Sequence, residues 1–381
     1  MLEREGFEIY VAEEVIEEGH EYRAITQFEM IKIKFFRNKL AVTGGIVLII
    51  LYLFFVIFPH FFATNDFMQQ NEDYIFAPPQ WPKFIDHDGN FHLRPFVYGY
   101  QSELNLETYS WEYKINYNEK YPIYFITRGY NYKLFGLFNM NWHLLGLGQD
   151  KKLFLLGTDR LGRDLFSRIL FGGRISLTIG LIGVALTIII GSFMGTLSGY
   201  FGGKIDDFIQ RIIELLMSFP SIPLWAALAA VLPAEWSPIE TFFAISIILS
   251  LKNWTGLARQ VRGKVLSYRE EEYTYAARVA GASDLYIIFR HMLPNCLSHI
   301  LVIATLSIPG MILAETSLSF LGLGIQPPMT SWGVLLKDAQ KISVVLQHPW
   351  LMIPGIFVVF AVLAYNFFGD GVRDAIDPYS N

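Results

Sequence analysis

The stretch TYAARVAGASDLYIIFRHMLPN, residues 274–295, lies between two strongly apolar runs and carries a central glycine, Gly281. Ala277, Ala280 and Gly281 fall near one face of a predicted helix, where small side chains would let a partner's surface approach the backbone. Gly281 permits a turn, and Pro294 marks the start of the next apolar run. The stretch therefore predicts a loop that binds something other than lipid.

The composition of the 381-residue chain indicates a membrane protein. Hydrophobic residues make up 52% of it and charged residues 17%, against roughly 25% charged in ordinary soluble domains. Runs of about 18 or more apolar residues can span a bilayer. We count six such runs, at residues 40–58, 175–197, 208–232, 239–257, 297–321 and 350–368. The first is not a cleavable signal peptide, because residues 1–39, which include a long acidic stretch, precede it.

Basic residues beside these runs predict the orientation. One group crowds the start of the first run and consists of Lys32, Lys34, Arg37 and Lys39. A second group fills the loop around Gly281 and consists of Arg259, Arg262, Lys264, Arg269, Arg278 and Arg290. By the positive-inside rule both groups lie in the cytoplasm. Six spans then place both termini inside and residues 59–168 outside.

The formal net charge of -5 is unevenly distributed. Residues 1–29 hold nine Glu, no Asp and only two Arg, so the acidity belongs to the N-terminal tail. Apolar residues such as Phe7, Val11 and Val15 alternate there with glutamates at helical spacing, which predicts a short amphipathic helix. It is either a solvated surface helix or a docking element for a cytoplasmic partner.

Aromatic residues are concentrated in the outer segment. Residues 59–150 contain 23 aromatic residues in 92 positions, compared with 16% for the whole chain. Tyr113, Ile115 and Tyr117 alternate with polar residues, and YPIYFITRGYNYKLFGLF, residues 121–138, is typical of β-strands. We predict a small β-rich cap whose aromatic rings form its core and its seat on the helices. Stacking on sugar rings, covering a peptide and docking a substrate-delivering partner are the alternatives.

The stretch LLGTDRLGRDLFSRILFGGRISL, residues 155–177, follows the cap. Asp159 and Arg163 are four residues apart, as are Asp164 and Arg168. A helix that begins near Thr158 would therefore carry two acid-to-base pairs at the membrane surface. The plain interpretation is a structural anchor.

Ionisable residues within membrane spans are functional candidates by default. Glu214 lies in the third run, Lys252 in the fourth and Glu315 near the middle of the fifth. A buried charge needs a partner, so we favour pairing or hydrogen bonding between helices over direct contact with substrate.

Catalytic motifs are not found. The Gly203-Lys204 pair has Ser198 where a phosphate-binding loop needs its first Gly and Ile205 where it needs Ser or Thr. The His-Glu-x-x-His and Gly-x-Ser-x-Gly patterns are missing as well. The single cysteine, Cys296, excludes an internal disulfide and a cysteine metal cage. We predict no catalytic, cofactor-binding or metal-binding residue in this chain.

Residues 274–295 resemble the signature loop of the membrane subunits of ATP-binding-cassette importers. That loop reads Glu-Ala-Ala, three residues, Gly, nine residues, Ile, one residue, Leu-Pro. The matching positions here are Ala276, Ala277, Gly281, Leu293 and Pro294. Two positions depart, with Tyr275 in place of Glu and His291 in place of Ile, and the histidine variant is familiar in the peptide and nickel branch.

A second element resembles the same class. Gly-Thr-Asp, two residues, Gly-Arg-Asp precedes the second span of peptide and nickel permeases, and here it comprises Gly157, Thr158, Asp159, Gly162, Arg163 and Asp164. The resemblance continues through GYFGGKIDDFIQR, AETSLSFLGLGIQPPMTSWG, which contains Glu315, and FFGDGVRDAIDP. It covers residues 153–378 and the first span, whereas the aromatic insertion is longer than the usual connection.

The resemblance implies an inner-membrane permease subunit of a peptide/nickel-class importer, similar to the second subunit of oligopeptide and dipeptide permeases. It would be an all-α polytopic protein of a prokaryotic cytoplasmic membrane, with six transmembrane helices in a type I importer core and an inserted, β-rich extracytoplasmic domain. The parts would be a tail and basic flank (1–39), the first helix (40–58), the insertion (59–168) and a five-helix core (169–381) with a coupling loop (258–296).

The resemblance also implies partners. The chain would form half of a path for oligopeptides beside a second, homologous permease, with an extracytoplasmic solute-binding protein above. Two nucleotide-binding ATPase subunits below would hold ATP and Mg, and this chain would bind no cofactor. They would dock on the coupling loop, whose candidate residues are Tyr275, Ala276, Ala277, Ala280, Gly281, Ala282, Asp284, Leu293 and Pro294.

Other functions are weighed against this one. An oligosaccharide importer of the same class is the main alternative, because the aromatic cap would suit sugars, and nickel is a lesser one. An ion-driven secondary transporter would usually show inverted repeats and broken helices with buried ion ligands. A membrane-anchored sensor would not need six spans. The alanine-glycine loop favours the importer, although the sequence leaves the solute open.

Overall fold

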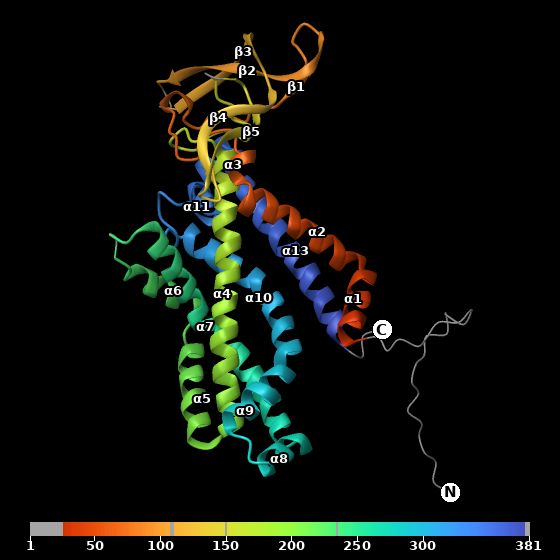
Figure 1. The fold of residues 1–381 in the computed structure, drawn as a ribbon. Helices are drawn as coiled ribbons and strands as arrows, with labels where there is room; N and C mark the ends of the chain where they lie inside the picture. The colour runs from red at the N-terminus through yellow and green to blue at the C-terminus, as the bar shows by residue number, and fades with distance from the viewer. Residues whose placement is uncertain (1–25, 107–109, 149–150, 234, 378–381) are drawn as a thin grey trace, which may run out of the picture.

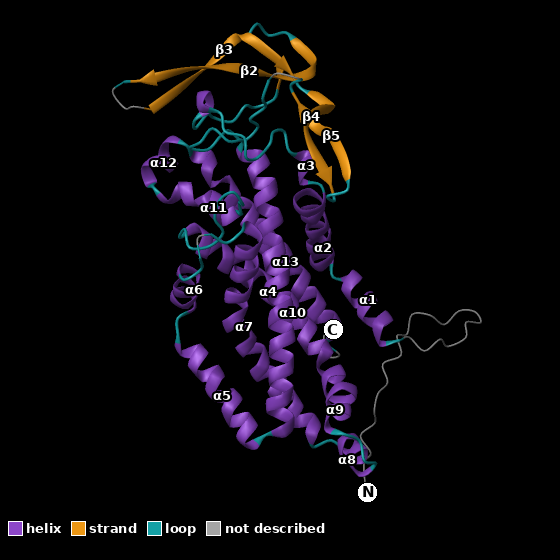
Figure 2. Cartoon of the chain, turned by 60° about the vertical axis from the view of Figure 1, so that its left-hand side comes forward, coloured by secondary structure: helices purple, strands orange, loops and turns teal. Residues whose placement is uncertain are grey.

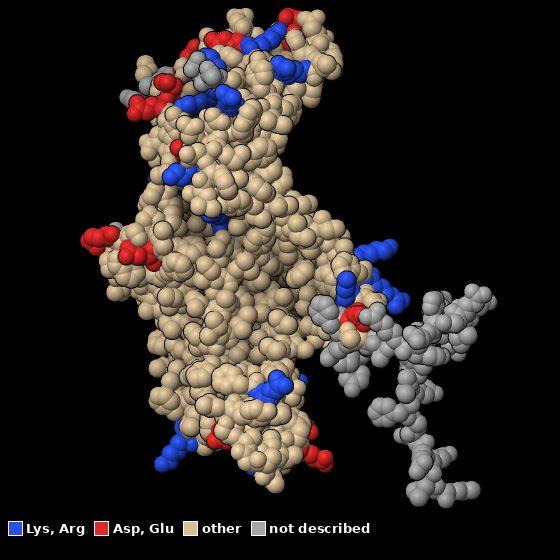
Figure 3. Space-filling model, in the orientation of Figure 1, with Lys and Arg blue, Asp and Glu red and all other residues tan. Residues whose placement is uncertain are grey.

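The computed structural model describes residues 26–106, 110–148, 151–233 and 235–377. Long helices lie side by side, and a layer of β-strands covers one end of them (Figures 1 and 2). Figure 3 shows a broad uncharged band across the helices, with charged side chains mainly beyond it at the strand layer, at the opposite end and near α1 (Gln27–Arg37). The amphipathic helix expected in the acidic tail lies outside the described residues.

Five helices in the described part of the chain are long and apolar enough to cross a membrane. They are Lys39–Ile57 (α2, Lys39–Leu51, with η1, Tyr52–Ile57), Leu165–Phe201 (α4), Pro238–Arg269 (α7), Asp284–Phe320 (ending in α10, Leu293–Phe320) and Pro349–Ile376 (mostly α13, Ile353–Ile376). Between the second and third of these, α5 (Gly203–Ser218) and α6 (Ser221–Ala230) meet at an angle of 90°. The count of six spans holds only if this bent pair is one span.

The bend has a local cause. Phe219 and Pro220 separate α5 from α6, and both adopt extended backbone conformations. A proline has no amide hydrogen for the helix, and it drives the preceding residue away from the helical region. The apolar run at residues 208–232 therefore folds as two helices instead of one straight helix.

Close packing of α4 on α7 depends on glycines spaced four residues apart. An added Cβ would lie within 3.0 Å of an α7 carbonyl oxygen at three positions, namely Gly191 (Trp254), Gly195 (Ala258) and Gly199 (Arg262). Gly44 of α2 meets Ala364 of α13 in the same way, at 2.8 Å. Small residues let helix backbones approach each other in this manner.

The strands form two antiparallel sheets. One contains β1 (Lys83–Ile85), β2 (Phe91–Asn105) and β3 (Ser110–Pro122) in that order, and the other pairs β4 (Tyr124–Leu134) with β5 (Phe138–Gly146). The β-structure expected at residues 121–138 is present, and the β4–β5 register shifts between Arg128 and Tyr132. β4 therefore remains a single strand through this irregularity.

The expectation that the aromatic rings form the core of this layer is only partly right. Its cluster of buried hydrophobic residues is aliphatic and consists of Val97, Ile123, Leu147 and Leu153. Large rings remain exposed, among them Trp81 at 66%, Phe91 at 69% and Phe135 at 64%. Sheets of three and two strands offer few inward-facing positions, so many side chains of the alternating pattern must face outward.

A second group of rings seats the β4–β5 hairpin on the helices. His60, in α3 (Pro59–Phe62), stacks on Tyr132 with ring centroids 4.9 Å apart. Burial, followed by the positive charges of Arg174 and His143, lowers the pKa of His60 to about 4, so this ring packs as a neutral group at pH 7. His143 is 1% exposed, and its ring nitrogens each lie 3.0 Å from a backbone carbonyl oxygen, of Ala63 and Tyr130 respectively.

Candidate functional site

The signature loop lies at the end of the bundle opposite the strands (Figure 1). It contains α8 (Glu272–Val279) and α9 (Asp284–Ile287), separated by a turn in which Gly281 has φ +82°. The turn predicted at Gly281 is therefore present, because glycine adopts positive φ without steric cost. Ser283 begins α9 by accepting a hydrogen bond from the backbone N–H of Tyr286 at 3.3 Å. The first part of the range 258–296 is helical, since α7 continues to Arg269.

The predicted contact residues of this loop divide into two groups. Ala277, Ala282 and Leu293 are half-buried and pack against a hydrophobic cluster of the chain itself, which includes Tyr200 and Val261. The exposed members are Tyr275, Ala276, Ala280, Gly281, Asp284 and Pro294. Of the two alanines expected on one partner-facing surface, Ala280 is exposed, whereas Ala277 packs in part against its own chain.

Polar contacts hold the loop to the end of α4. The Tyr200 hydroxyl donates a hydrogen bond to the Asp284 carboxylate at 2.7 Å. The Arg278 guanidinium lies 5.4 Å from the centroid of the Tyr200 ring. Nearby, Arg262 of α7 donates two hydrogen bonds of 2.6 Å to Asp206 of α5. A hydrogen bond and a cation–π contact thus join the loop to the end of α4.

Tyr275, where the importer pattern has Glu, contacts a carboxylate. Its hydroxyl donates a hydrogen bond of 2.6 Å to Glu270, just after the end of α7. This hydrogen bond and then the Arg269 guanidinium, which lies 3.1 Å from Glu270, lower the pKa of the Glu270 carboxyl. An exposed acidic group thus stands beside position 275 even though the side chain at 275 is aromatic.

The Gly-Thr-Asp and Gly-Arg-Asp element forms a compact turn that we call the outer clasp, residues 157–164 together with Arg168. The Asp159 carboxylate is 2% exposed and accepts hydrogen bonds from both Arg163, at 2.8 Å, and Arg168. Its other oxygen accepts from the backbone N–H of Leu161 at 2.8 Å and from that of Arg163 at 3.0 Å. One carboxylate therefore closes the turn and binds two guanidinium groups.

The helix expected from Thr158 is wrong, as is the Asp164–Arg168 pair. α4 begins at Leu165, and Asp164 is its N-cap, accepting a hydrogen bond from the backbone N–H of Ser167 at 3.1 Å. Asp164 also accepts from the Thr64 hydroxyl at 2.9 Å. The physical reason is local, since aspartate readily caps a helix or closes a turn with its side chain.

Two glycines of the outer clasp bring it against the segment after α3. A Cβ at Gly162, which has φ +66°, would lie 1.8 Å from the Asn71 carbonyl oxygen. A Cβ at Gly157, which has φ +76°, would lie 2.6 Å from that of Ala77. Neither site has room for a side chain. These two positions therefore require glycine, and the clasp ties the chain before the strands to the chain after them.

Glu315 connects three elements. It is 0% exposed and accepts hydrogen bonds from the hydroxyls of Ser176, on α4, at 2.8 Å and Ser319, on α10, at 2.7 Å. The Ser176 oxygen in turn accepts from the backbone N–H of Trp332, in α11 (Trp332–Leu336), at 3.2 Å. The predicted hydrogen bonding between helices is confirmed at this residue.

The other two ionisable candidates are less buried. Glu214 is exposed on α5 and pairs with Arg211 at 3.1 Å. Lys252 donates a hydrogen bond of 2.5 Å to the carbonyl oxygen of Phe219, at the bend between α5 and α6. The Lys252 ammonium thereby supplies a hydrogen bond to a backbone carbonyl group at the end of the interrupted helix.

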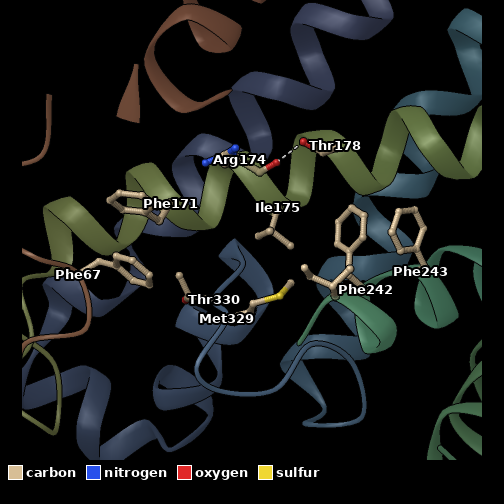
Figure 4. Close-up of a pocket in the computed structure, with 10 residues that line it drawn as sticks. Phe67, Phe171, Arg174, Ile175, Thr178, Phe242, Phe243, Met329 and Thr330 are labelled. Atoms are coloured by element: carbon tan, nitrogen blue, oxygen red, sulfur yellow. Dashed lines mark hydrogen bonds between the residues drawn. The ribbon is translucent and has the colours of Figure 1, made fainter. Parts of the chain in front are cut away.

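A cavity of about 350 Å³ lies between α4, α7 and the loop before α11 (Figure 4). Aromatic side chains from three segments line it, namely Phe67, Phe171, Phe242 and Phe243. Arg174 is its only charged lining residue, and it forms no ion pair within the described part of the chain. The sequence reasoning missed Arg174, although its place at the very start of an apolar run was a usable signal.

Comparisons with known proteins agree with this architecture. The family described as binding-protein-dependent transport system inner membrane component matches residues 166–379. The N-terminal transmembrane domain of oligopeptide transport permease C matches residues 26–79. The strands β1 to β5 and most of the outer clasp fall between the two matched ranges.

Individual relatives are similar over more than half of the chain. An oligopeptide transport system permease protein of Haemophilus influenzae is 42% identical, over 62% of this chain and 75% of its own. A dipeptide transport system permease protein of Alkalihalophilus pseudofirmus is also 42% identical, over 58% and 71%. An inward-facing structure of the MetNI methionine ABC transporter covers 55% of this chain and 96% of its own at 18% identity, with a TM-score of 0.44. This chain is a multi-pass membrane protein and belongs to the binding-protein-dependent transport system inner membrane component family.

Proposed function

We propose that the chain is one permease subunit of an ATP-driven oligopeptide importer, in which it forms half of the translocation path. The observation that carries this proposal is the signature loop, which exposes Ala276, Ala280 and Gly281 at one end of the bundle while Ala277 fixes it to the core. Relatives at about this level of identity are named as oligopeptide, dipeptide and glutathione transport permeases. They favour a peptide over an oligosaccharide as the solute.

The helices suit the transmission of a movement from one end of the bundle to the other. α4 has 37 residues and is therefore about 55 Å long. Its inner end is held to the signature loop through Tyr200 and Asp284, and its outer end belongs to the clasp through Arg168 and Asp159. A rigid helix with both ends fixed moves as a unit, which is the form of coupling that alternating access requires.

The proposal includes partners, orientation and domains. The loop docks on one of two ATPase subunits, which hold ATP and Mg, and a second, related permease completes the path in a type I importer core. Both termini and the signature loop then lie in the cytoplasm of a prokaryote. Residues 59–168 form an inserted, β-rich extracytoplasmic domain on the side where a solute-binding protein delivers its ligand.

Nucleotide chemistry is expected only in the assembled complex. The purified chain should neither bind nor hydrolyse ATP, because it has no phosphate-binding loop. Proteoliposomes that also contain the second permease and the ATPases should hydrolyse ATP faster when peptide-loaded binding protein is added, and should accumulate labelled peptide. The control is Lys204→Ala, which removes the lysine of the Gly203-Lys204 pair and should change neither rate. Nucleotide binding to the isolated chain would contradict the assignment.

The orientation can be tested by proteolysis. Protease added to right-side-out vesicles should cleave within residues 59–168 and the short loops on the same side, and should leave residues 258–296 intact. In inverted vesicles the pattern should reverse. Fragments would be identified by mass spectrometry, with detergent-solubilised protein as the control for intrinsic susceptibility. Cleavage of the signature loop in right-side-out vesicles would show that the chain is inserted the other way.

A further inference from the structure

The tip of the β4–β5 hairpin is apolar and exposed. Phe135, Leu137 and Phe138 are exposed by 64%, 78% and 64%. Residues 134–142 contain no Asp, Glu, Lys or Arg. A water-exposed hairpin turn is ordinarily rich in polar residues, so three large apolar side chains at one tip indicate contact with an apolar partner.

The hairpin reaches down to the end of the first membrane-crossing helix. Figure 2 shows β4 and β5 extending from the strand layer toward α3 and the nearer end of α2. The rings of Phe135 and Phe58 have centroids 6.2 Å apart. Phe58 directly follows the 19-residue span Lys39–Ile57. A helix of that length rises about 28 Å, close to the roughly 30 Å thickness of the hydrocarbon layer. The tip therefore lies at the edge of that layer.

The tip continues the lipid-facing surface of the span. Leu53, Phe54 and Ile57, in the last turns before Phe58, are 38%, 39% and 38% exposed. These side chains belong to a helix whose length and composition suit the bilayer interior. The exposed surface thus runs from the span to Phe135 at the hairpin tip, and lipid is the partner whose chemistry suits both parts of it.

Two features fix the hairpin at this level. The seat formed by His60, Tyr132 and His143 holds β4 and β5 against α3. Farther from the tip, the Arg128 guanidinium lies 5.5 Å from the centroid of the Trp142 ring. Trp142 is four residues from Phe138, about 13 Å along the strand. If the tip touches acyl chains, Trp142 and Arg128 lie at the level of the lipid headgroups, where amphipathic rings and cations are favoured.

We propose that the tip of the β4–β5 hairpin, residues 135–138, inserts into the bilayer leaflet nearest the strands and anchors the strand layer there. The binding partner is the boundary between headgroups and acyl chains, which accepts aromatic and aliphatic side chains. This inference goes beyond the importer function and does not depend on which side of the membrane the strands occupy. Its consequence is a strand layer held at a constant height over the helices.

The test measures the depth of the tip directly. Leu137→Cys in a Cys296→Ala background would carry a nitroxide spin label, and the full chain would be reconstituted in vesicles of phosphatidylcholine and phosphatidylglycerol. The single native cysteine is buried, which limits background labelling. We expect the label to lose collisions with a water-soluble nickel chelate and to gain collisions with oxygen, which concentrates among acyl chains.

The matched control is Leu93→Cys, on β2 of the other sheet, where the native side chain is 90% exposed. That label should collide freely with the nickel chelate. Equal access of the chelate to both labels would overturn the proposal. So would protection of the Leu137 label from both reagents, because that result indicates a protein cover. A label at Phe138→Cys, where the native side chain is 64% exposed, provides a second reading should Leu137→Cys fold poorly.

Discussion

Replacing Asp159 with asparagine should destabilise the permease by about 3–5 kcal/mol, because it leaves the buried Arg168 guanidinium without its carboxylate. The Asp159 and Arg168 side chains are only 2% and 5% exposed. Arg163, at 14%, can turn to solvent, whereas Arg168 is enclosed at the start of α4. The measurement is thermal unfolding of the purified chain in detergent, together with its yield in the membrane fraction.

An exposed ion pair supplies the control. Arg211 pairs with Glu214 at 3.1 Å, and the two side chains are 83% and 65% exposed. Exposed pairs contribute about 0–1 kcal/mol, so the midpoint of thermal unfolding of Arg211→Ala should lie close to that of the unmodified chain. Equal midpoints for Asp159→Asn and Arg211→Ala would show that the clasp contributes nothing to stability.

A double substitution distinguishes loss of the Asp159–Arg168 ion pair from loss of the turn that Asp159 closes. Asp159→Leu with Arg168→Met replaces the buried charges by apolar groups, a change that is often neutral or stabilising when the volume is preserved. It should recover a large part of the loss seen in Asp159→Asn, although Arg163 also loses its partner. No recovery would mean that the turn closed by Asp159, through its contacts to Leu161 and Arg163, carries the effect.

The second large effect concerns the turn of the signature loop. Gly281→Val should abolish transport and release the ATPases, while insertion into the membrane stays normal. Gly281 has φ +82° and nothing within 4 Å of the position that a Cβ would occupy, so the cost is backbone strain and not a clash within the chain. Such strain costs about 1–3 kcal/mol, and the turn can escape it by changing the angle between α8 and α9.

Two further substitutions make this test specific. Gly281→Asn should retain more activity than Gly281→Val, because asparagine tolerates positive φ. Gly263→Ala on α7 also has open space around the added Cβ but does not have positive φ, so it should be nearly silent. Capture of the ATPases by the tagged permease and peptide uptake in vesicles are the readouts. If Gly263→Ala also lost ATPase capture and peptide uptake, this end of the helix bundle would be sensitive to substitution in general.

Substitutions at Ala276 and Ala277 should distinguish an effect on ATPase docking from an effect on folding. Ala276 is exposed, so Ala276→Glu should impair ATPase capture without altering the thermal unfolding of the isolated chain. Ala277 packs on the cluster around Tyr200, so Ala277→Glu buries a carboxylate and should lower stability as well. Fully coupled transport in both Gly281→Val and Ala276→Glu would show that the loop is not the transmission point.

The sequence predicted those features that depend on local rules. Five of the six apolar runs became long helices, because backbone groups in lipid must satisfy each other within the helix. Gly281 provides the expected turn. In each case the side chain, or its absence, determines the conformation of its own segment.

Residue spacing predicted the wrong ion pairs where a polar side chain had more than one available partner. Asp159 and Asp164 each stand four residues before an arginine, yet Asp159 binds both Arg163 and Arg168, and Asp164 caps α4. The helical pairing was a valid local option. In the arrangement that the fold adopts, the clasp also receives hydrogen bonds from Thr64 and Asn71, which lie 100 and 91 residues before their partners Asp164 and Gly162.

Only the tertiary structure decided which surfaces stay exposed. Ala277 and Ala280 share a predicted helical face, but Ala277 is half-buried against a cluster that includes Tyr200 and Val261, whereas Ala280 is exposed. The cavity at Arg174 and the hairpin tip beside Phe58 likewise join segments far apart in sequence. Periodicity determines which residues share a face of one element, whereas burial of that face depends on the elements that pack against it, and those contacts are not local.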